Sequence, residues 1–198
     1  QRANPQAGRR ITWDYIRKER RALPPAEFAR ERLGWWDDPA DAGQVNDPAA
    51  WADSEDRSSE PVGPVRFVLD VSPMSDWSCI LAAGDNGSGR THLEITSDVD
   101  DADQLVMDYR PGVAWVVPRL AVMAGRHDGF VVHIVDGSSA ESLVPALTHA
   151  GVSVEVHPHA EHKQACVHFH AQLHSDGLAH LGQQALTVAV LAGSMRSQ

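Results

Sequence analysis

Two aspartates are the strongest candidates for chemistry in this sequence, because each lies at the end of an apolar run. Asp70 occurs in "FVLDV" and Asp136 in "FVVHIVDG". A buried strand rarely tolerates an unpaired carboxylate, since desolvating the charge is costly unless a partner or a cation compensates it. Carboxylate oxygens at a strand end suit Mg²⁺ or Mn²⁺, and a pair of such ions can stabilise the attacking and leaving oxygens of phosphoryl transfer. Asp70 and Asp136 are therefore predicted to be metal ligands and catalytic residues.

Each aspartate also has an ordinary structural interpretation. Asp70 could cap the turn "DVSP", and Asp136 could begin the "DGSS" turn into a helix. Taken singly, each residue is more typical of such a turn. Taken as a pair on neighbouring strands, the two residues favour the metal site.

The elements that must position the two aspartates follow from the periodicity of apolar residues. Strands are predicted over 65–71, 77–83 and 90–97, then 130–136 and 152–156, and helices over 114–126, 138–151, 159–175 and 183–193. The turn "GDNGSG" makes the first three strands an antiparallel meander. Strands that then alternate with helices predict an α/β fold, a mixed sheet flanked by helices. A right-handed crossover would make 65–71 and 130–136 neighbours, with Asp70 beside Asp136.

The N-terminal region differs from the rest in charge and composition. Helices are predicted over 12–22 and 25–34, followed by a linker over 37–64 with four prolines among acids and serines. The whole chain has a net charge of -10, but residues 1–35 hold nine Lys and Arg against four Asp and Glu. A basic segment is typical of nucleic-acid binding, although a charged helix surface is an equally good interpretation. The candidate DNA-binding residues are Arg17, Lys18, Arg20 and Arg21.

Other site classes have less support. Two cysteines, Cys79 and Cys166, exclude a disulfide framework and a four-cysteine zinc site. No apolar run of eighteen residues and no signal peptide are found, so a soluble, cytosolic chain without membrane contact is expected. Several histidines have spacings that can hold zinc, but without an HExxH motif or a cysteine pair, solvated histidines are favoured. These are His157, His159 and His162, and the pair His170 and His174. The tryptophans Trp35, Trp36 and Trp51 are expected to pack against the sheet rather than to stack on bases.

Successive blocks of the sequence resemble the large terminase subunit of tailed bacteriophages and prophages, of the type found with actinobacterial hosts. The blocks are "EFARERLGWW", "LDVSP", "YRPGVAWVVPRLA", "VVHIVDG", "SLVPAL", "AGVSVEV", "EHKQAC" and "HLGQQAL", in order over nearly the whole chain. The resemblance implies an RNase H-like nuclease domain over 65–198. It implies that 1–36 is the helical tail of the ATPase domain, joined by the linker 37–64.

The family's first catalytic aspartate matches Asp70 and its second matches Asp136. The resemblance implies a third acid in a "GDAW"-like segment beyond the "HLGQQAL" block, and this chain stops at Gln198 before such a segment. It also lacks a Walker A loop, so the family's ATPase domain is absent here and the chain is expected to be a fragment, C-terminally incomplete in its nuclease domain.

The function implied is a metal-dependent endonuclease that cuts concatemeric double-stranded DNA with two Mg²⁺ or Mn²⁺ ions. The expected location is the bacterial host cytoplasm, and the expected partners are the portal protein and the small terminase subunit. The alternative is a non-catalytic assembly module or inactive prophage remnant that docks to the portal or small terminase.

Overall fold

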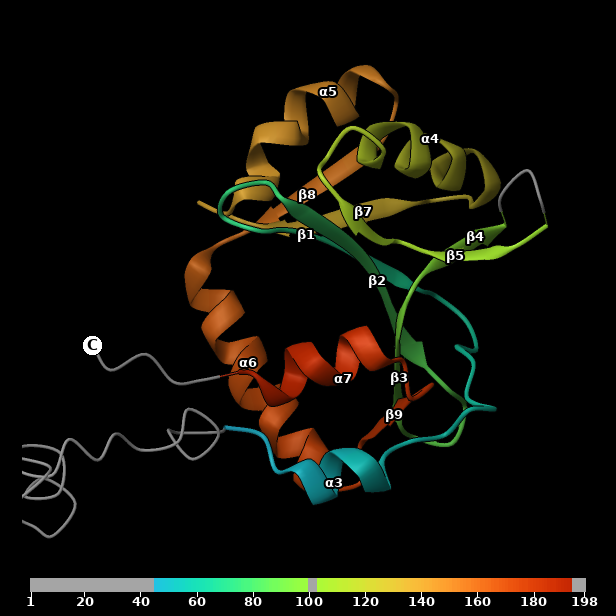
Figure 1. Cartoon of the computed structure of the whole chain (residues 1–198), viewed down its shortest axis with the longest axis vertical. Helices are drawn as coiled ribbons and strands as arrows, with labels where there is room; N and C mark the ends of the chain where they lie inside the picture. Colours follow the sequence, from blue (N-terminus) through green and yellow to red (C-terminus); the bar gives the residue numbers. More distant parts are fainter. Residues whose placement is uncertain (1–44, 100–102, 194–198) are drawn as a thin grey trace, which may run out of the picture. The chain divides into compact units, whose positions relative to one another are not determined.

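The structure of this chain is a computed structural model that describes residues 45–99 and 103–193 (Figure 1). The two helices predicted before residue 35, with the candidate DNA-binding residues Arg17, Lys18, Arg20 and Arg21, lie outside the described residues. The helices are α3 (Pro48–Asp53), α4 (Val116–Arg126), the 3-10 helix η1 (Ser139–Leu143), α5 (Val144–His149), α6 (His159–His174) and α7 (Gln184–Leu191). The strands are β1 (Arg66–Val71), β2 (Trp77–Asp85), β3 (Thr91–Ile95), β4 (Ser97–Val99), β5 (Leu105–Met107), β6 (Tyr109–Pro111), β7 (Val131–Val135), β8 (Ser153–His157) and β9 (Leu178–His180).

A seven-stranded mixed sheet forms the centre of the described part of the chain. Its strand order is β8-β7-β1-β2-β3-β9, and β6 pairs with the first residues of β2. The strands β1, β2 and β3 form the predicted antiparallel meander. The strands β7 and β8 extend the sheet in parallel from β1, and β9 adds in parallel to β3. The predicted α/β class with a mixed sheet is therefore confirmed.

Helices cover both faces of this sheet (Figure 1). On one face, α4 and α5 bury Leu120 and Leu147 against the apolar side chains of β1 and β7. On the other face, α3, α6 and α7 surround a second cluster that contains Ile95 and Leu178. Along β2 the side chains alternate between the two clusters, with Ile80 in the first and Leu81 in the second, because successive side chains of a strand point to opposite faces. A polar residue that alternates with side chains of the first cluster therefore points to the other face of the sheet.

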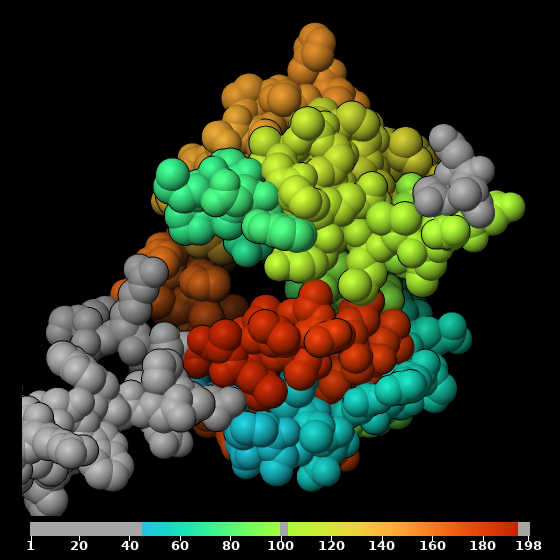
Figure 2. Space-filling view, viewed as in Figure 1, coloured from blue at the N-terminus to red at the C-terminus, as the bar shows by residue number. Residues whose placement is uncertain are grey.

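The expectation of little structure over 37–64 is wrong for part of that segment. Residues 48–53 form α3, where Asp47 caps the helix by accepting the N–H of Ala49 at 2.8 Å. The indole of Trp51 is only 2% exposed and stacks on the ring of His180 with 3.7 Å between centroids. Figure 2 shows this N-terminal described segment, in blue, lying against the red segment of α7. Burial of Trp51 confirms the expectation that this tryptophan packs rather than binds bases.

Two predicted elements are divided in the structure. The strand predicted over 90–97 is split into β3 and β4 at Thr96, whose N–H donates to the carbonyl of Ile80 and whose carbonyl accepts the N–H of Asp108. The helix predicted over 138–151 begins as η1 and continues as α5, and it ends before Gly151, which has a φ of +79°. No helix within 45–99 and 103–193 has the length and apolar character needed to cross a membrane.

Candidate functional site

Asp70 lies on the exposed side of β1, in a strand whose burial alternates. Phe67, Leu69 and Val71 face the core beneath α4 and α5, so the two-residue period of a strand turns Asp70 toward the opposite face. The strand is therefore buried along one face only, and the expectation that Asp70 interrupts a fully buried strand is wrong. Within the described part of the chain, the Asp70 carboxylate has no hydrogen bond or ion pair.

Asp136 follows directly after β7 and is exposed. Its backbone N–H donates to the carbonyl oxygen of His157 at 2.9 Å, which joins the end of β7 to the end of β8. The strands β1 and β7 are parallel neighbours, with Val68 opposite His133. The predicted adjacency of the two strands is confirmed. Asp70 and Asp136 thus lie toward the carboxyl ends of adjacent parallel strands. Asp70 is on the face of the sheet away from α4 and α5, whereas Asp136, just beyond β7, is in phase with Val132 and Ile134, which face those helices.

Neither aspartate side chain holds the turn that its ordinary interpretation predicted. In the turn after β1, the hydroxyl of Ser72 accepts the N–H of Trp77 at 3.1 Å. In the turn after β7, the carboxylate of Glu141 accepts the N–H of Gly137 at 2.9 Å. Both Asp70 and Asp136 keep their oxygens available for another ligand.

Two exposed carboxylates at adjacent strand ends are suited to a hard divalent cation. Such a cation takes oxygen ligands and retains several waters when the protein supplies few of them. Within the described residues, no third His, Cys, Asp or Glu completes a three-ligand group with Asp70 and Asp136. The remaining positions around a cation here are open to water or to phosphate oxygens.

The Asp70 charge affects Cys79, its partner across the β1–β2 pair. Burial raises the pKa of the Cys79 thiol to about 12, and the negative charges of Asp70 and Asp108 add to the increase. Cys79 is therefore a neutral thiol at physiological pH. Cys166, by contrast, is exposed on α6.

We expect iodoacetamide at pH 8 to label Cys166 at least about tenfold faster than Cys79. The reactive species is the thiolate, and its fraction falls tenfold for each unit by which the pKa exceeds the pH. Mass spectrometry of peptides from a timed labelling series measures both rates. Replacing Asp70→Asn removes one of the charges that raise the pKa, so Cys79 labelling should accelerate in that variant. Equal rates for the two cysteines would contradict the burial of Cys79.

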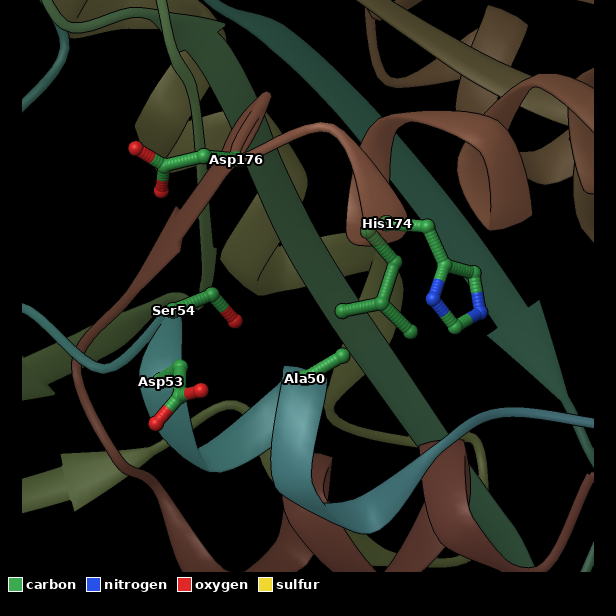
Figure 3. Close-up of a pocket in the computed structure, with 6 residues that line it drawn as sticks. Ala50, Asp53, Ser54, His174 and Asp176 are labelled. Atoms are coloured by element: carbon green, nitrogen blue, oxygen red, sulfur yellow. The ribbon is translucent and has the colours of Figure 1, made fainter.

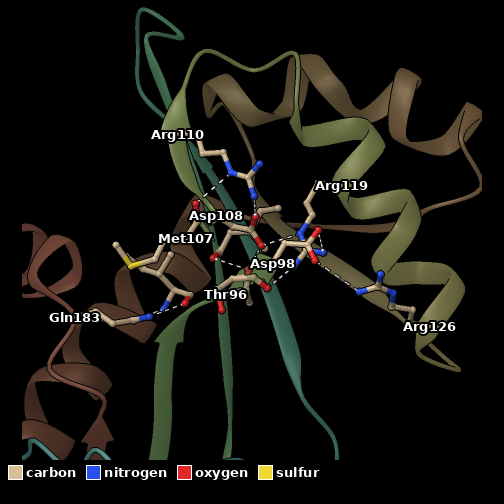
Figure 4. Close-up of polar contacts among 11 residues, drawn as sticks. Thr96, Asp98, Met107, Asp108, Arg110, Arg119, Arg126 and Gln183 are labelled. Atoms are coloured by element: carbon tan, nitrogen blue, oxygen red, sulfur yellow. Dashed lines mark hydrogen bonds and ion pairs between the residues drawn. The ribbon is translucent and has the colours of Figure 1, made fainter. Parts of the chain in front are cut away.

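A buried polar network fixes the strands beside the aspartate pair (Figure 4). Asp108 is 0% exposed, and its carboxylate accepts hydrogen bonds from Thr96, Arg110 and Arg119 at 2.7–2.9 Å. Arg119, on α4, also contacts Asp98 at 2.9 Å. The charge of Asp108 is therefore neutralised inside the fold.

Sequence reasoning missed His133 and Glu155, which lie beside His157 at the edge of the sheet. The pairing of β7 with β8 places His133 opposite Glu155, and His157 follows two residues later on the same face. Burial lowers the pKa of His133, which keeps its imidazole neutral at pH 7. The sequence shows polar residues at alternate positions in "SVEVH" and one in "VVHIV". That these residues meet follows only from the register of β7 against β8.

A surface pocket of about 330 Å³ lies between α3 and the end of α6 (Figure 3). Ala50, Asp53 and Ser54 line it from one side, and Leu173, His174 and Asp176 from the other. None of these residues belongs to β1 or β7. The pocket is thus separate from the aspartate pair.

Comparison with known proteins gives the fold. No family model matches the sequence, and no curated protein matches it significantly. The large terminase of bacteriophage HK97 matches with a TM-score of 0.57 and 13% identity, over 96% of this chain and 45% of that chain. A large terminase of a thermophilic bacteriophage gives a TM-score of 0.45 and 12% identity, over 87% of this chain and 42% of that one.

The chain spans less than half the length of either terminase. At 13% identity the likeness to the HK97 protein concerns the fold alone. A mixed sheet flanked by helices, as found in part of a phage large terminase, is consistent with the predicted RNase H-like fold.

Proposed function

We propose that this chain is a metal-dependent endonuclease domain of the type that serves DNA packaging in a phage large terminase. The observation that carries the proposal is the pair of exposed, uncommitted carboxylates, Asp70 and Asp136, toward the carboxyl ends of adjacent parallel strands. The terminase-like fold supports the assignment to DNA packaging. The substrate is double-stranded DNA, and the packaging partners are the portal protein and the small terminase subunit.

The residues present fit a hard divalent cation, because both donors are carboxylates and both reach solvent. Asp70 and Asp136 would hold Mg²⁺ or Mn²⁺. When bound, such ions lower the pKa of a coordinated water and stabilise the charge that develops on the leaving oxygen. The contribution of the chain is to hold two negative oxygens at fixed positions. Without a cation these two carboxylates repel the phosphates of DNA, so cation binding is expected to precede DNA cleavage.

The function is tested by plasmid nicking. The chain should convert supercoiled plasmid only slowly to the open circular form when Mn²⁺ is present, and EDTA should stop the reaction. We expect Mn²⁺ to support faster cleavage than Mg²⁺, because Mg²⁺ demands near-ideal octahedral geometry and two protein carboxylates supply few ligands. Stoichiometric Mn²⁺ binding without any nicking would favour the alternative function, an assembly module that docks to the portal or small terminase.

DNA contact is proposed to use Arg17, Lys18, Arg20 and Arg21 in the basic N-terminal segment. Replacing all four by alanine should weaken binding to duplex DNA and flatten its salt dependence. Each lost phosphate contact lowers the slope of log K against log salt by about 0.9. Fluorescence anisotropy at several salt concentrations measures the slope. The control replaces Arg57, an exposed arginine already paired with Glu55, and should leave the slope unchanged. An unchanged slope in the fourfold variant would assign the basic segment to protein docking.

A further inference from the structure

Three side chains with metal-binding atoms converge at the outer edge of the sheet. His133 lies on β7, and Glu155 and His157 lie on the edge strand β8. One ligand atom from each residue lies within 4.8 Å of the others, and within the described residues this is the one group of three with that property. The Nδ1 atom of His133 lies 2.8 Å from the Nε2 atom of His157. One carboxylate oxygen of Glu155, Oε2, lies 3.6 Å from the first nitrogen, and the other, Oε1, lies 3.8 Å from the second.

These separations match the spacing of ligands around one small metal ion. Zinc binds nitrogen and oxygen at about 2.0–2.2 Å in a tetrahedron, so its ligand atoms lie about 3.3 Å apart. The observed separations of 2.8, 3.6 and 3.8 Å lie on both sides of that value. Small rotations of the side chains therefore complete the geometry. Because all three residues stand on paired strands, the backbone that carries them is already ordered.

A fourth residue orients one of the ligands. The carboxylate of Glu161, in the first turn of α6, lies 3.0 Å from the Nδ1 atom of His157. A carboxylate at this position accepts the Nδ1 proton and leaves the lone pair on Nε2, which is the arrangement common behind metal-binding histidines. In the metal-free chain, His133 then donates its Nδ1 proton to His157. A metal ion between the two nitrogens takes the place of that proton, and His133 then carries its single ring proton on Nε2.

The group is open to solvent on one side. The side chains of His133, His157 and Glu155 are 13%, 29% and 57% exposed, so the two imidazoles are partly enclosed and the carboxylate faces water. Three protein ligands with one open position are typical of a zinc site that keeps a bound water. Two imidazoles also select a transition metal over Mg²⁺, which prefers oxygen.

We propose that His133, Glu155 and His157 form a binding site for a divalent transition metal of the zinc class, with Glu161 orienting His157. The site is separate in its ligands from the proposed site at Asp70 and Asp136. Metal binding at His133, Glu155 and His157 does not depend on whether the chain cleaves DNA. Because the His157 carbonyl accepts the backbone N–H of Asp136, metal binding also braces the strand end that carries this aspartate.

Titration of the 198-residue chain with Co²⁺ tests the proposal, since tetrahedral Co²⁺ absorbs visible light when bound to such ligands. One equivalent of Co²⁺ should produce the absorption band, and one equivalent of Zn²⁺ should remove it. The variants His133→Gln, His157→Gln and Glu155→Gln should each lose the band at that concentration. Because Glu155 is exposed, Glu155→Gln should fold like the parent chain, so loss of the band in this variant reports loss of metal binding and not loss of folding. The variant Glu161→Gln should bind about tenfold to a hundredfold more weakly.

The matched control removes a second histidine pair. His170 and His174 lie one turn apart on α6, with 4.6 Å between ring centroids, and they lack a strand carboxylate beside them. Replacing both by glutamine should leave the band and the stoichiometry unchanged. A band that survives in Glu155→Gln and His157→Gln, or one that disappears with the His170 and His174 pair, overturns the proposal. Absence of any Co²⁺ band in the unmodified chain overturns it as well.

Discussion

Asp70→Asn is expected to reduce Mn²⁺-dependent nicking of plasmid DNA by about a hundredfold to a thousandfold. The change removes one negative oxygen ligand and keeps the size of the side chain. A catalytic cation contributes several kcal/mol to the stabilisation of the transition state, and each 1.4 kcal/mol corresponds to a factor of ten in rate. Asp136→Asn should have the same effect, because it removes the other half of the pair. Calorimetry with Mn²⁺ should show the loss of binding in both variants.

The fold should survive both substitutions. Asp70 and Asp136 are exposed, and among the described residues neither carboxylate has a hydrogen bond or ion pair to lose. Thermal unfolding without metal should therefore match the parent chain. Asp76→Asn is the matched control, since Asp76 is an exposed aspartate in the turn after β1 and its replacement removes the same charge. If Asp70→Asn nicks DNA and binds Mn²⁺ as well as Asp76→Asn does, the metal site lies elsewhere.

The strands that carry these aspartates could be predicted because their apolar residues recur with a clear period. β1 has apolar residues on one face, β7 is apolar except for His133, and β8 alternates valines with polar residues. The helix α4 places Val116, Leu120 and Met123 on its buried side. The crossover rule then makes β1 and β7 neighbours. These local and topological signals are sufficient to place Asp70 and Asp136 on adjacent strands from the sequence alone.

Elements that depend on distant partners could not be predicted in this way. β9 has three residues, too few for a period, and it forms because His180 stacks on Trp51 and pairs its backbone with Ser54. The helix α3 had a local signal in Asp47 and Pro48, but the acidic, proline-containing context indicated a linker. The helix α3 forms because its Trp51 is buried in the second cluster, on the face of the sheet away from α4 and α5.

The metal-binding atoms of His133 and Glu155 were missed for a related reason. Each residue alone is an ordinary polar side chain on a half-exposed strand. Only the register of β7 against β8 places His133 opposite Glu155, and register depends on the whole sheet. The burial of Asp108 likewise depends on the fold, because Arg119 on α4 and the Thr96 hydroxyl reach its carboxylate only when these segments pack together.

Asp108→Ala is expected to lower the free energy of unfolding by about 3–5 kcal/mol, the usual cost of removing one partner from a buried ion pair. The reason is the position of the residue at the centre of its network. The substitution removes the 2.9 Å contact of Asp108 with the guanidinium of Arg119, which is itself 8% exposed. It also leaves the Thr96 hydroxyl with only its longer, 3.2 Å bond to the carbonyl oxygen of Ile80. Urea denaturation, followed by circular dichroism, measures the change. A loss of this size is a large part of the stability of an ordinary domain.

Asp98→Ala is the matched control for this network, because Asp98 contacts the same arginine from a partly exposed position. An ion pair of that kind contributes about 1 kcal/mol or less, so the control should lose much less stability than Asp108→Ala. Asp108→Asn should fall between the two, because an amide oxygen can still accept a hydrogen bond from Thr96 but carries no charge to neutralise Arg110 and Arg119. Equal losses for Asp108→Ala and Asp98→Ala would mean that Asp108 is solvated in the folded chain. In that case the buried network would not fix β6 and α4 beside the aspartate pair.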